Sequence, residues 1–148
     1  MAKRFFPLYN LDQPVGPGKP NLPDDVRLVQ NLFIELSRFY ANIDWHKDIP
    51  QDQRNLSTTS RFDDQLETWI KTYQNWLVKG FGGTANFRSD GVIDPMPVHS
   101  IAVDVVFKSG RISTLSMMCN QLWRFDRNTY FRVGDGDNMK WFPEGFAN

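Results

Sequence analysis

Cys119 is the first candidate for chemistry, because it is the single cysteine among 148 residues. A catalytic thiol needs a histidine that helps to form the thiolate, and the chain has two, His46 and His99. Cys119 lies in an apolar stretch with helical spacing, which favours a buried structural thiol over a nucleophile. A single cysteine also excludes an intramolecular disulfide.

Metal sites are the second possibility. A hydrolytic zinc site needs about three protein ligands and one open position. His99 and Asp104 lie five residues apart, and His46 would have to join them from a distant loop. The acidic run at 135–138 invites a calcium site, but the residues after it break the EF-hand pattern at its glycine and at its bidentate acid. A plain turn is the better interpretation of that run.

Glycoside cleavage would need two carboxylates that flank one bond. Glu35 is the only acid within the apolar stretch of the first predicted helix, and Asp44 or Asp52 would be its partner. An exposed or salt-bridged Glu35 is the better interpretation. We therefore expect no catalytic residues, no metal and no cofactor, and we expect a protein that binds rather than an enzyme.

Aromatic side chains offer the clearest binding chemistry. Trp69, Tyr73 and Trp76 fall within two helical turns and can share one side of a helix. Aromatic rings of this kind can stack on the C–H faces of sugars, while polar neighbours such as Arg88 and Asp90 fix the orientation of the ligand. The alternative is that the rings belong to the core.

Charge and hydropathy exclude two classes of partner. Lys and Arg number 17 and so do Asp and Glu, so the basic excess of a nucleic-acid-binding protein is missing. No stretch approaches the roughly 20 apolar residues that span a bilayer. The apolar run near the N-terminus is broken by Pro7 and is too short for a signal peptide. We expect cytoplasmic synthesis, with release by lysis or by a dedicated secretion machine.

The first half of the chain predicts two helices. Four prolines within residues 1–22 favour an extended arm. Pro23, two acidic residues after it and a continuous apolar stripe predict a helix over 23–41. The polar composition of residues 42–60 predicts a loop. Asp63 is a competent N-cap for a second helix over 63–78, which the glycines that begin at Gly80 are expected to end.

The second half of the chain combines strand-like and helix-like residue patterns. Residues 100–107 are rich in β-branched side chains and predict a strand. Residues 111–117 are compatible with a returning strand, but the spacing favours a third helix over 114–125. The aromatic segments 130–133 and 139–142 lie on either side of a Gly/Asp/Asn turn and predict a hairpin.

Three side chains are expected to organise loops. Gln30 and Gln74 each follow an apolar helix position, where a side-chain amide can bind the backbone of a neighbouring loop. Asp90 can accept from N–H groups of its own turn, while Gly91 supplies a positive φ.

Four segments resemble peptidoglycan-binding-like domains. The stretch 15–33, VGPGKPNLPDDVRLVQNLF, resembles the glycine-rich opening and first helix of that family. The segment 61–74, which ends in Tyr73 and Gln74, is similar to the second helix. Ser89–Pro95, SDGVIDP, resembles the turn that follows, and 113–122 resembles the closing helix. The sequence departs from the family at Trp69, in the long connection at 42–60 and in the insertion at 96–112.

The resemblance implies a mainly α fold: a three-helix core over 23–127, preceded by the arm 1–22 and followed by an aromatic hairpin or tail over 128–148. It implies a non-catalytic module that recognises cell-wall peptidoglycan. One alternative is a structural or adaptor component of a phage-tail-like or secretion apparatus, which would bind a protein partner. A third is a small cell-wall hydrolase. Neither nucleic acid nor membrane insertion is expected.

Overall fold

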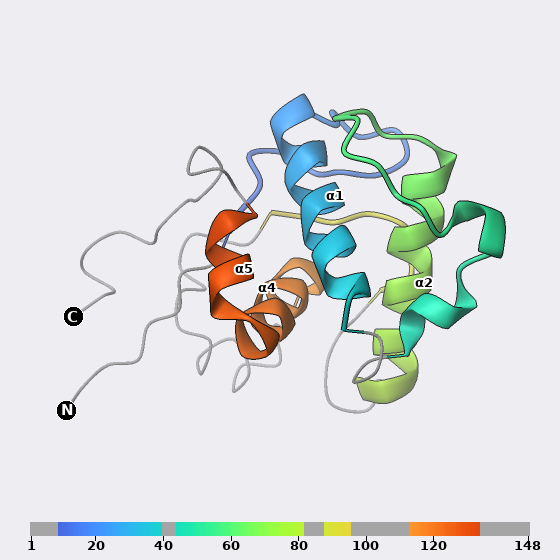
Figure 1. Cartoon of the computed structure of the whole chain (residues 1–148). Coiled ribbons are helices and arrows are strands. Elements are labelled where there is room, and N and C mark those ends of the chain that lie inside the picture. Colours follow the sequence, from blue (N-terminus) through green and yellow to red (C-terminus); the bar gives the residue numbers. More distant parts are fainter. Residues whose placement is uncertain (1–8, 40–43, 82–87, 96–112, 134–148) are drawn as a thin grey trace.

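The computed structural model of the chain describes residues 9–39, 44–81, 88–95 and 113–133. The described part is mainly helical, as expected (Figure 1). Its helices are α1 (Pro23–Ser37), α2 (Asp64–Phe81), α4 (Thr114–Phe125) and α5 (Arg127–Arg132), and two 3-10 turns, Trp45–Asp48 and Gln51–Gln53, precede α2. In these ranges the β structure is a single isolated bridge between Val15 and Ile93.

α1 begins where the sequence predicts and ends earlier than 41. Pro23 lies at its start, and Asp24 and Asp25 occupy the first turn. At the other end the N–H groups of Arg38 and Phe39 donate to carbonyls three residues back. This tighter 3-10 pattern closes the last turn and ends the α-helix at Ser37.

α2 begins as predicted and continues past its predicted end. The Asp63 carboxylate accepts from the N–H of Leu66 at 2.8 Å, which is an N-cap. α2 passes through Gly80, the first of the three glycines expected to end it, and ends at Phe81, directly before Gly82. A glycine inside a helix costs only about 0.5–1 kcal/mol, and the buried Leu77 still anchors that turn to the core.

The third predicted helix is confirmed as α4. Ser113 and Ser116 form a reciprocal capping box at its start, which fixes the helix over the strand alternative from residue 114 onward. Its buried apolar residues face α1, and Cys119 lies among them.

The predicted strand over 130–133 is wrong. Residues up to Arg132 belong to α5, because the Asp126 carboxylate caps this short helix by accepting from the N–H groups of Asn128 and Thr129. Tyr130 is fully buried and anchors the helix to the body. The boundary that we expected between the helical core, 23–127, and the C-terminal tail, 128–148, falls inside α5. The second half of the predicted hairpin, 139–142, and the predicted strand 100–107 lie outside the described residues.

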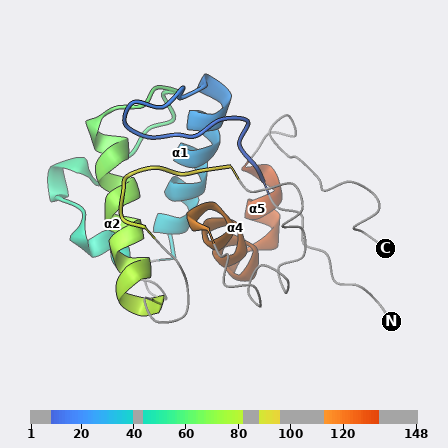
Figure 2. The same cartoon turned by 180° about the vertical axis from the view of Figure 1, so that it is seen from behind.

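The segment before α1 packs against the helices. Tyr9, Leu11 and Val15 are core residues. Val15 exchanges two backbone hydrogen bonds with Ile93, of 2.8 and 3.0 Å, so the segments 9–22 and 88–95 meet on the side of α1 that faces the viewer in Figure 2. The buried carboxylate of Asp25 accepts from the N–H groups of residues 12 and 13, both at 3.0 Å.

Gln30, on α1, holds the loop that enters α2. Its carbonyl oxygen accepts from the N–H of Ser60 at 2.9 Å. Its amide donates to the Thr59 hydroxyl at 3.0 Å and to the Arg61 carbonyl at 3.3 Å. Ser60 has a φ of +61°, a left-handed conformation that is uncommon for serine. The expected contact of Gln30 with loop backbone is confirmed.

Gln74, on α2, repeats the arrangement. Its carbonyl oxygen accepts from the N–H of Gly91 at 2.9 Å, and its amide donates to the Val92 carbonyl at 2.8 Å and the Asp90 carboxylate at 3.4 Å. Gly91 has a φ of +75°, and Asp90 accepts from the N–H of Val92 at 3.0 Å, as expected. We call each set of contacts a glutamine bridge.

We predict that Gln74→Ala lowers the free energy of unfolding by about 2–3 kcal/mol, because it removes several buried hydrogen bonds and leaves the Gly91 N–H without its acceptor. The measurement is chemical denaturation followed by circular dichroism. Lys79→Ala, at an exposed position of the same helix, is the control and should change the value by less than about 0.5 kcal/mol. Equal effects of the two variants would contradict a structural role of the bridge.

Candidate functional site

The predicted aromatic ligand face is largely inside the protein. Trp69 and Tyr73 are 1% and 0% exposed and pack with Phe33 and Trp45. Trp69 donates from Nε1 to the Gln53 carbonyl at 2.8 Å. Rings placed in this way have no open face for a ligand, so the core alternative holds for both of them.

Trp76 is the partly exposed member of the predicted set. It is half-buried and stacks on Tyr73 with ring centroids 5.9 Å apart. Its Nε1 donates to Asp44 at 3.1 Å. A hydrogen bond and the nearby charge of Lys47 lower the pKa of Asp44, and the bond from Trp76 adds to this effect.

Arg88 and Asp90 occupy a different place. Both are exposed and line a small pocket of about 150 Å³ beside Gln74. Trp76 is not among the described residues of that pocket. The structure therefore separates the predicted residues into an aromatic group on one side of α2 and a polar pair at the turn before α4.

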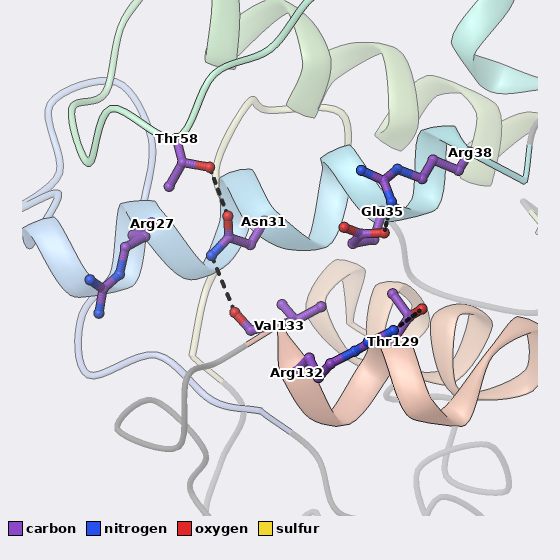
Figure 3. Close-up of a pocket in the computed structure, with 8 residues that line it drawn as sticks. All are labelled: Arg27, Asn31, Glu35, Arg38, Thr58, Thr129, Arg132 and Val133. Carbon is purple, nitrogen blue, oxygen red and sulfur yellow. Dashed lines mark hydrogen bonds and ion pairs between the residues drawn. The ribbon is translucent and has the colours of Figure 1, made fainter.

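A larger pocket lies elsewhere, between α1, α5 and the loop before α2 (Figure 3). Its volume is about 520 Å³. We call it the α1–α5 groove. It is lined by Arg27, Asn31 and Glu35 of α1 and by Arg38 at the end of that helix, together with Thr58, Thr129, Arg132 and Val133. The lining side chains are mostly polar or charged, which suits a charged ligand.

Asn31 ties the three walls of the groove together. Its carbonyl oxygen accepts from the Thr58 hydroxyl at 2.7 Å, and its amide donates to the Val133 carbonyl at 3.2 Å. These bonds connect the middle of α1 to the loop and to the end of α5 (Figure 3). The groove therefore has a fixed frame, which lowers the cost of ordering it around a ligand.

The charges of the groove are only partly paired. Arg38 forms an ion pair with Glu35 at 3.2 Å, and Arg27 approaches Asp24, which is outside the groove, at 3.6 Å. Arg132 donates to the Thr129 hydroxyl at 3.4 Å, and its charge contributes to the lowered pKa of Asp126, which is outside the groove. Three arginines and one glutamate give the lining a formal charge of 3 − 1 = +2.

The groove was not predicted from the sequence, although the spacing of its residues on the first helix indicates a shared face. Arg27, Asn31, Glu35 and Arg38 are spaced by four, four and three residues, which places them on one face of α1. Arg132 carried no such signal, since the segment around it was interpreted as a strand.

The structure separates the candidate carboxylates. Glu35 lines the α1–α5 groove and is ion-paired, as expected. Asp44 lines another pocket, of about 410 Å³, and Asp52 is exposed beyond it. Neither Asp44 nor Asp52 therefore shares a pocket with Glu35, as a pair of acids that flank one bond would.

The metal candidates are not brought together either. Among the described residues, no three His, Cys, Asp or Glu side chains are grouped so that they could hold a metal ion. His46 packs edge-on against Trp45 and Trp69, and its partial burial lowers its pKa. His99, Asp104 and the acidic run 135–138 lie outside the described residues.

No protein-family model, curated protein or solved structure matches this chain. The resemblance to peptidoglycan-binding-like domains is therefore an expectation from the sequence. Within the described ranges, none of the helices has the length and apolar content for crossing a membrane.

We predict that Cys119 is unreactive in the folded protein. Burial raises its pKa to about 12, so at pH 8 only about one thiol in ten thousand is ionised. Labelling with a thiol reagent should be at least a thousandfold slower, roughly, in the native protein than in denaturant. Labelling at similar rates in both states would contradict this placement.

The same pKa shift has a consequence for stability. The folded pKa lies above the unfolded value of 9.0, so the folded state favours the protonated thiol. Its contribution is fully present below pH 9 and is lost as the pH rises toward 12. Cys119→Ala should therefore lose less stability than the wild type over that pH interval.

Proposed function

We propose that the protein is a non-catalytic module that recognises cell-wall peptidoglycan. The observation that carries this proposal is the pair of glutamine bridges. Gln30, Gln74, Asp90 and Gly91 lie in the segments that resemble peptidoglycan-binding-like domains, and these residues make the hydrogen bonds that connect the helices to their loops. The resemblance therefore falls on residues that organise the fold rather than on scattered surface positions.

The two glutamine bridges have the same hydrogen-bond pattern. In each bridge the glutamine accepts from a residue of positive φ, at Ser60 or Gly91. It donates to the carbonyl of the next residue and to a side-chain oxygen of the previous one. Two copies of one local arrangement support an ancestry in which each of these two helices binds a loop that follows it in the sequence.

Two surfaces of the described part suit the chemistry of a cell wall. Peptidoglycan offers sugar rings, which stack on aromatic side chains, and peptides whose carboxylates bind arginine. Trp76 is a half-buried ring at the surface, and the α1–α5 groove presents three arginines. Arg88 and Asp90 remain candidate ligand contacts at the turn before α4.

We predict that the protein co-sediments with purified peptidoglycan sacculi. Trp76→Ala should reduce the bound fraction because it removes the ring, whereas Trp76→Phe should retain most of it. Val78→Ala, at an exposed position two residues along α2, is the matched control. Recovery of all the wild-type protein in the supernatant would overturn the proposal.

An adaptor in a tail-like or secretion assembly is the second candidate, and one surface feature favours it. Phe131 is 39% exposed and packs edge-on against Trp123. The guanidinium of Arg127 lies 4.6 Å from the centre of the same Trp123 ring. Aromatic residues and arginine are enriched at protein interfaces.

For the adaptor we predict self-association or a stable complex in size-exclusion chromatography with light scattering. Phe131→Ser should weaken that association, and Lys79→Ala should leave it unchanged. A strict monomer at high concentration that retains no protein partner would contradict this second candidate.

A further inference from the structure

The lining of the α1–α5 groove has a positive formal charge, although the net formal charge of the whole chain is zero. The whole sequence carries 17 basic and 17 acidic residues, yet the groove lining has a formal charge of +2. A guanidinium binds a carboxylate or phosphate through two parallel hydrogen bonds. The groove is therefore a site for an anionic ligand.

The spacing of the arginines selects an extended ligand. Arg27 lies on α1 and Arg38 is the residue that follows its end, eleven residues along, which is about 16 Å along a helix axis. Arg132 reaches the groove from α5, on the facing wall (Figure 3). Because arginine side chains are long, the guanidinium groups can approach one another more closely than the backbone does, and an extended peptide of a few residues, at roughly 3.3–3.6 Å per residue, can contact several of them.

Glu35 selects a ligand with a positive group as well. It is the one acid of the described lining and is largely covered from solvent, with 21% of its side chain exposed. Its partner is Arg38, at 3.2 Å, so a ligand carboxylate that binds Arg38 leaves Glu35 in need of another cation. A ligand with a free amine can instead pair with Glu35 while its carboxylates pair with the arginines.

Neutral groups complete the site. The hydroxyls of Thr58 and Thr129 line the groove beside Asn31. The Asn31 amide has two N–H groups, and one of them donates to the Val133 carbonyl. Among the described residues the second has no acceptor, so it is available to a peptide carbonyl.

From these features we infer that the α1–α5 groove binds a short acidic peptide that carries two carboxylates and one free amine. The origin of that peptide in the cell wall rests on the proposed function, whereas the recognition chemistry follows from the groove alone. The walls of the groove include α5, so this short helix is part of the binding site and not only a closing element.

Isothermal titration calorimetry with matched peptides tests the inference. The main probe is Nα-acetyl-Ala-γ-D-Glu-Lys, which has two carboxylates and one amine. Its Nε-acetylated form lacks the amine, and its diamide lacks both carboxylates. Acetyl-Ala-Asp-Lys has the same charges without the wall-type linkage. We expect saturable binding of the main probe, weaker at high ionic strength, and loss of binding with the diamide.

Variants of the groove identify the contacts. Arg132→Gln and Arg38→Gln should each weaken the main probe by about threefold to tenfold, since each removes a charge-assisted hydrogen bond. Arg124→Gln, at an exposed position of α4 outside the described lining, is the matched control and should have no effect. Glu35→Gln should abolish the preference for the free amine over the Nε-acetylated form. Thermal unfolding of each variant verifies that the fold is intact.

Binding that is absent, or equally weakened by Arg124→Gln and Arg132→Gln, would overturn the inference. Equal affinity for the two linkages assigns the site to acidic peptides in general, and preference for the γ-linked probe assigns it to the wall. If sacculi retain the wild type but none of the peptides binds, the proposed function stands and the groove inference fails. If the peptides bind through Arg132 but sacculi do not retain the protein, the reverse holds.

Discussion

Two buried side-chain amides hold the described fold together. Gln30 and Gln74 lie on consecutive long helices, and each supplies the hydrogen bonds that a left-handed loop residue and its neighbours would otherwise lack inside the protein. Unpaired backbone groups are costly when buried, so replacing either amide affects a whole loop. Gln30 binds the loop that leads into α2, and the Gln74 amide also donates to the Thr114 hydroxyl at the start of α4 at 3.3 Å. The two amides therefore help to position α2 and α4, and the pockets beside them follow from that placement.

Local signals in the sequence were enough for the three long helices. Pro23, Asp63 and Ser113 mark helix starts, and apolar stripes follow each of them. The sequence also identified both glutamines as residues that bind loops. It contains no comparable signal for Ser60, because the left-handed conformation there is imposed by the contact with Gln30 and not by a glycine.

Tertiary contacts decided the parts that the sequence did not predict. The aromatic and β-branched composition around Tyr130 favours a strand, but the Asp126 cap and the burial of Tyr130 make it a helix. The connection at 42–60 was interpreted as a polar loop, yet it supplies Trp45 and Ile49 to the core. Trp45 packs against Trp69 and Tyr73, and for that reason two residues of the predicted ligand face became core residues.

α5 has only six residues, which is too short for a stable helix on its own. Its anchor is Tyr130: the Tyr9 hydroxyl donates to the Tyr130 carbonyl at 2.5 Å, and the Tyr130 hydroxyl accepts from the Tyr9 N–H at 3.2 Å. These contacts join residues 121 positions apart, and contacts between distant residues form slowly because a long loop must close first. During synthesis Tyr9 leaves the ribosome long before Tyr130, so α1 and α2 can begin to assemble while the place of α5 is still empty. The order of synthesis thus makes the docking of α5 a late step of folding.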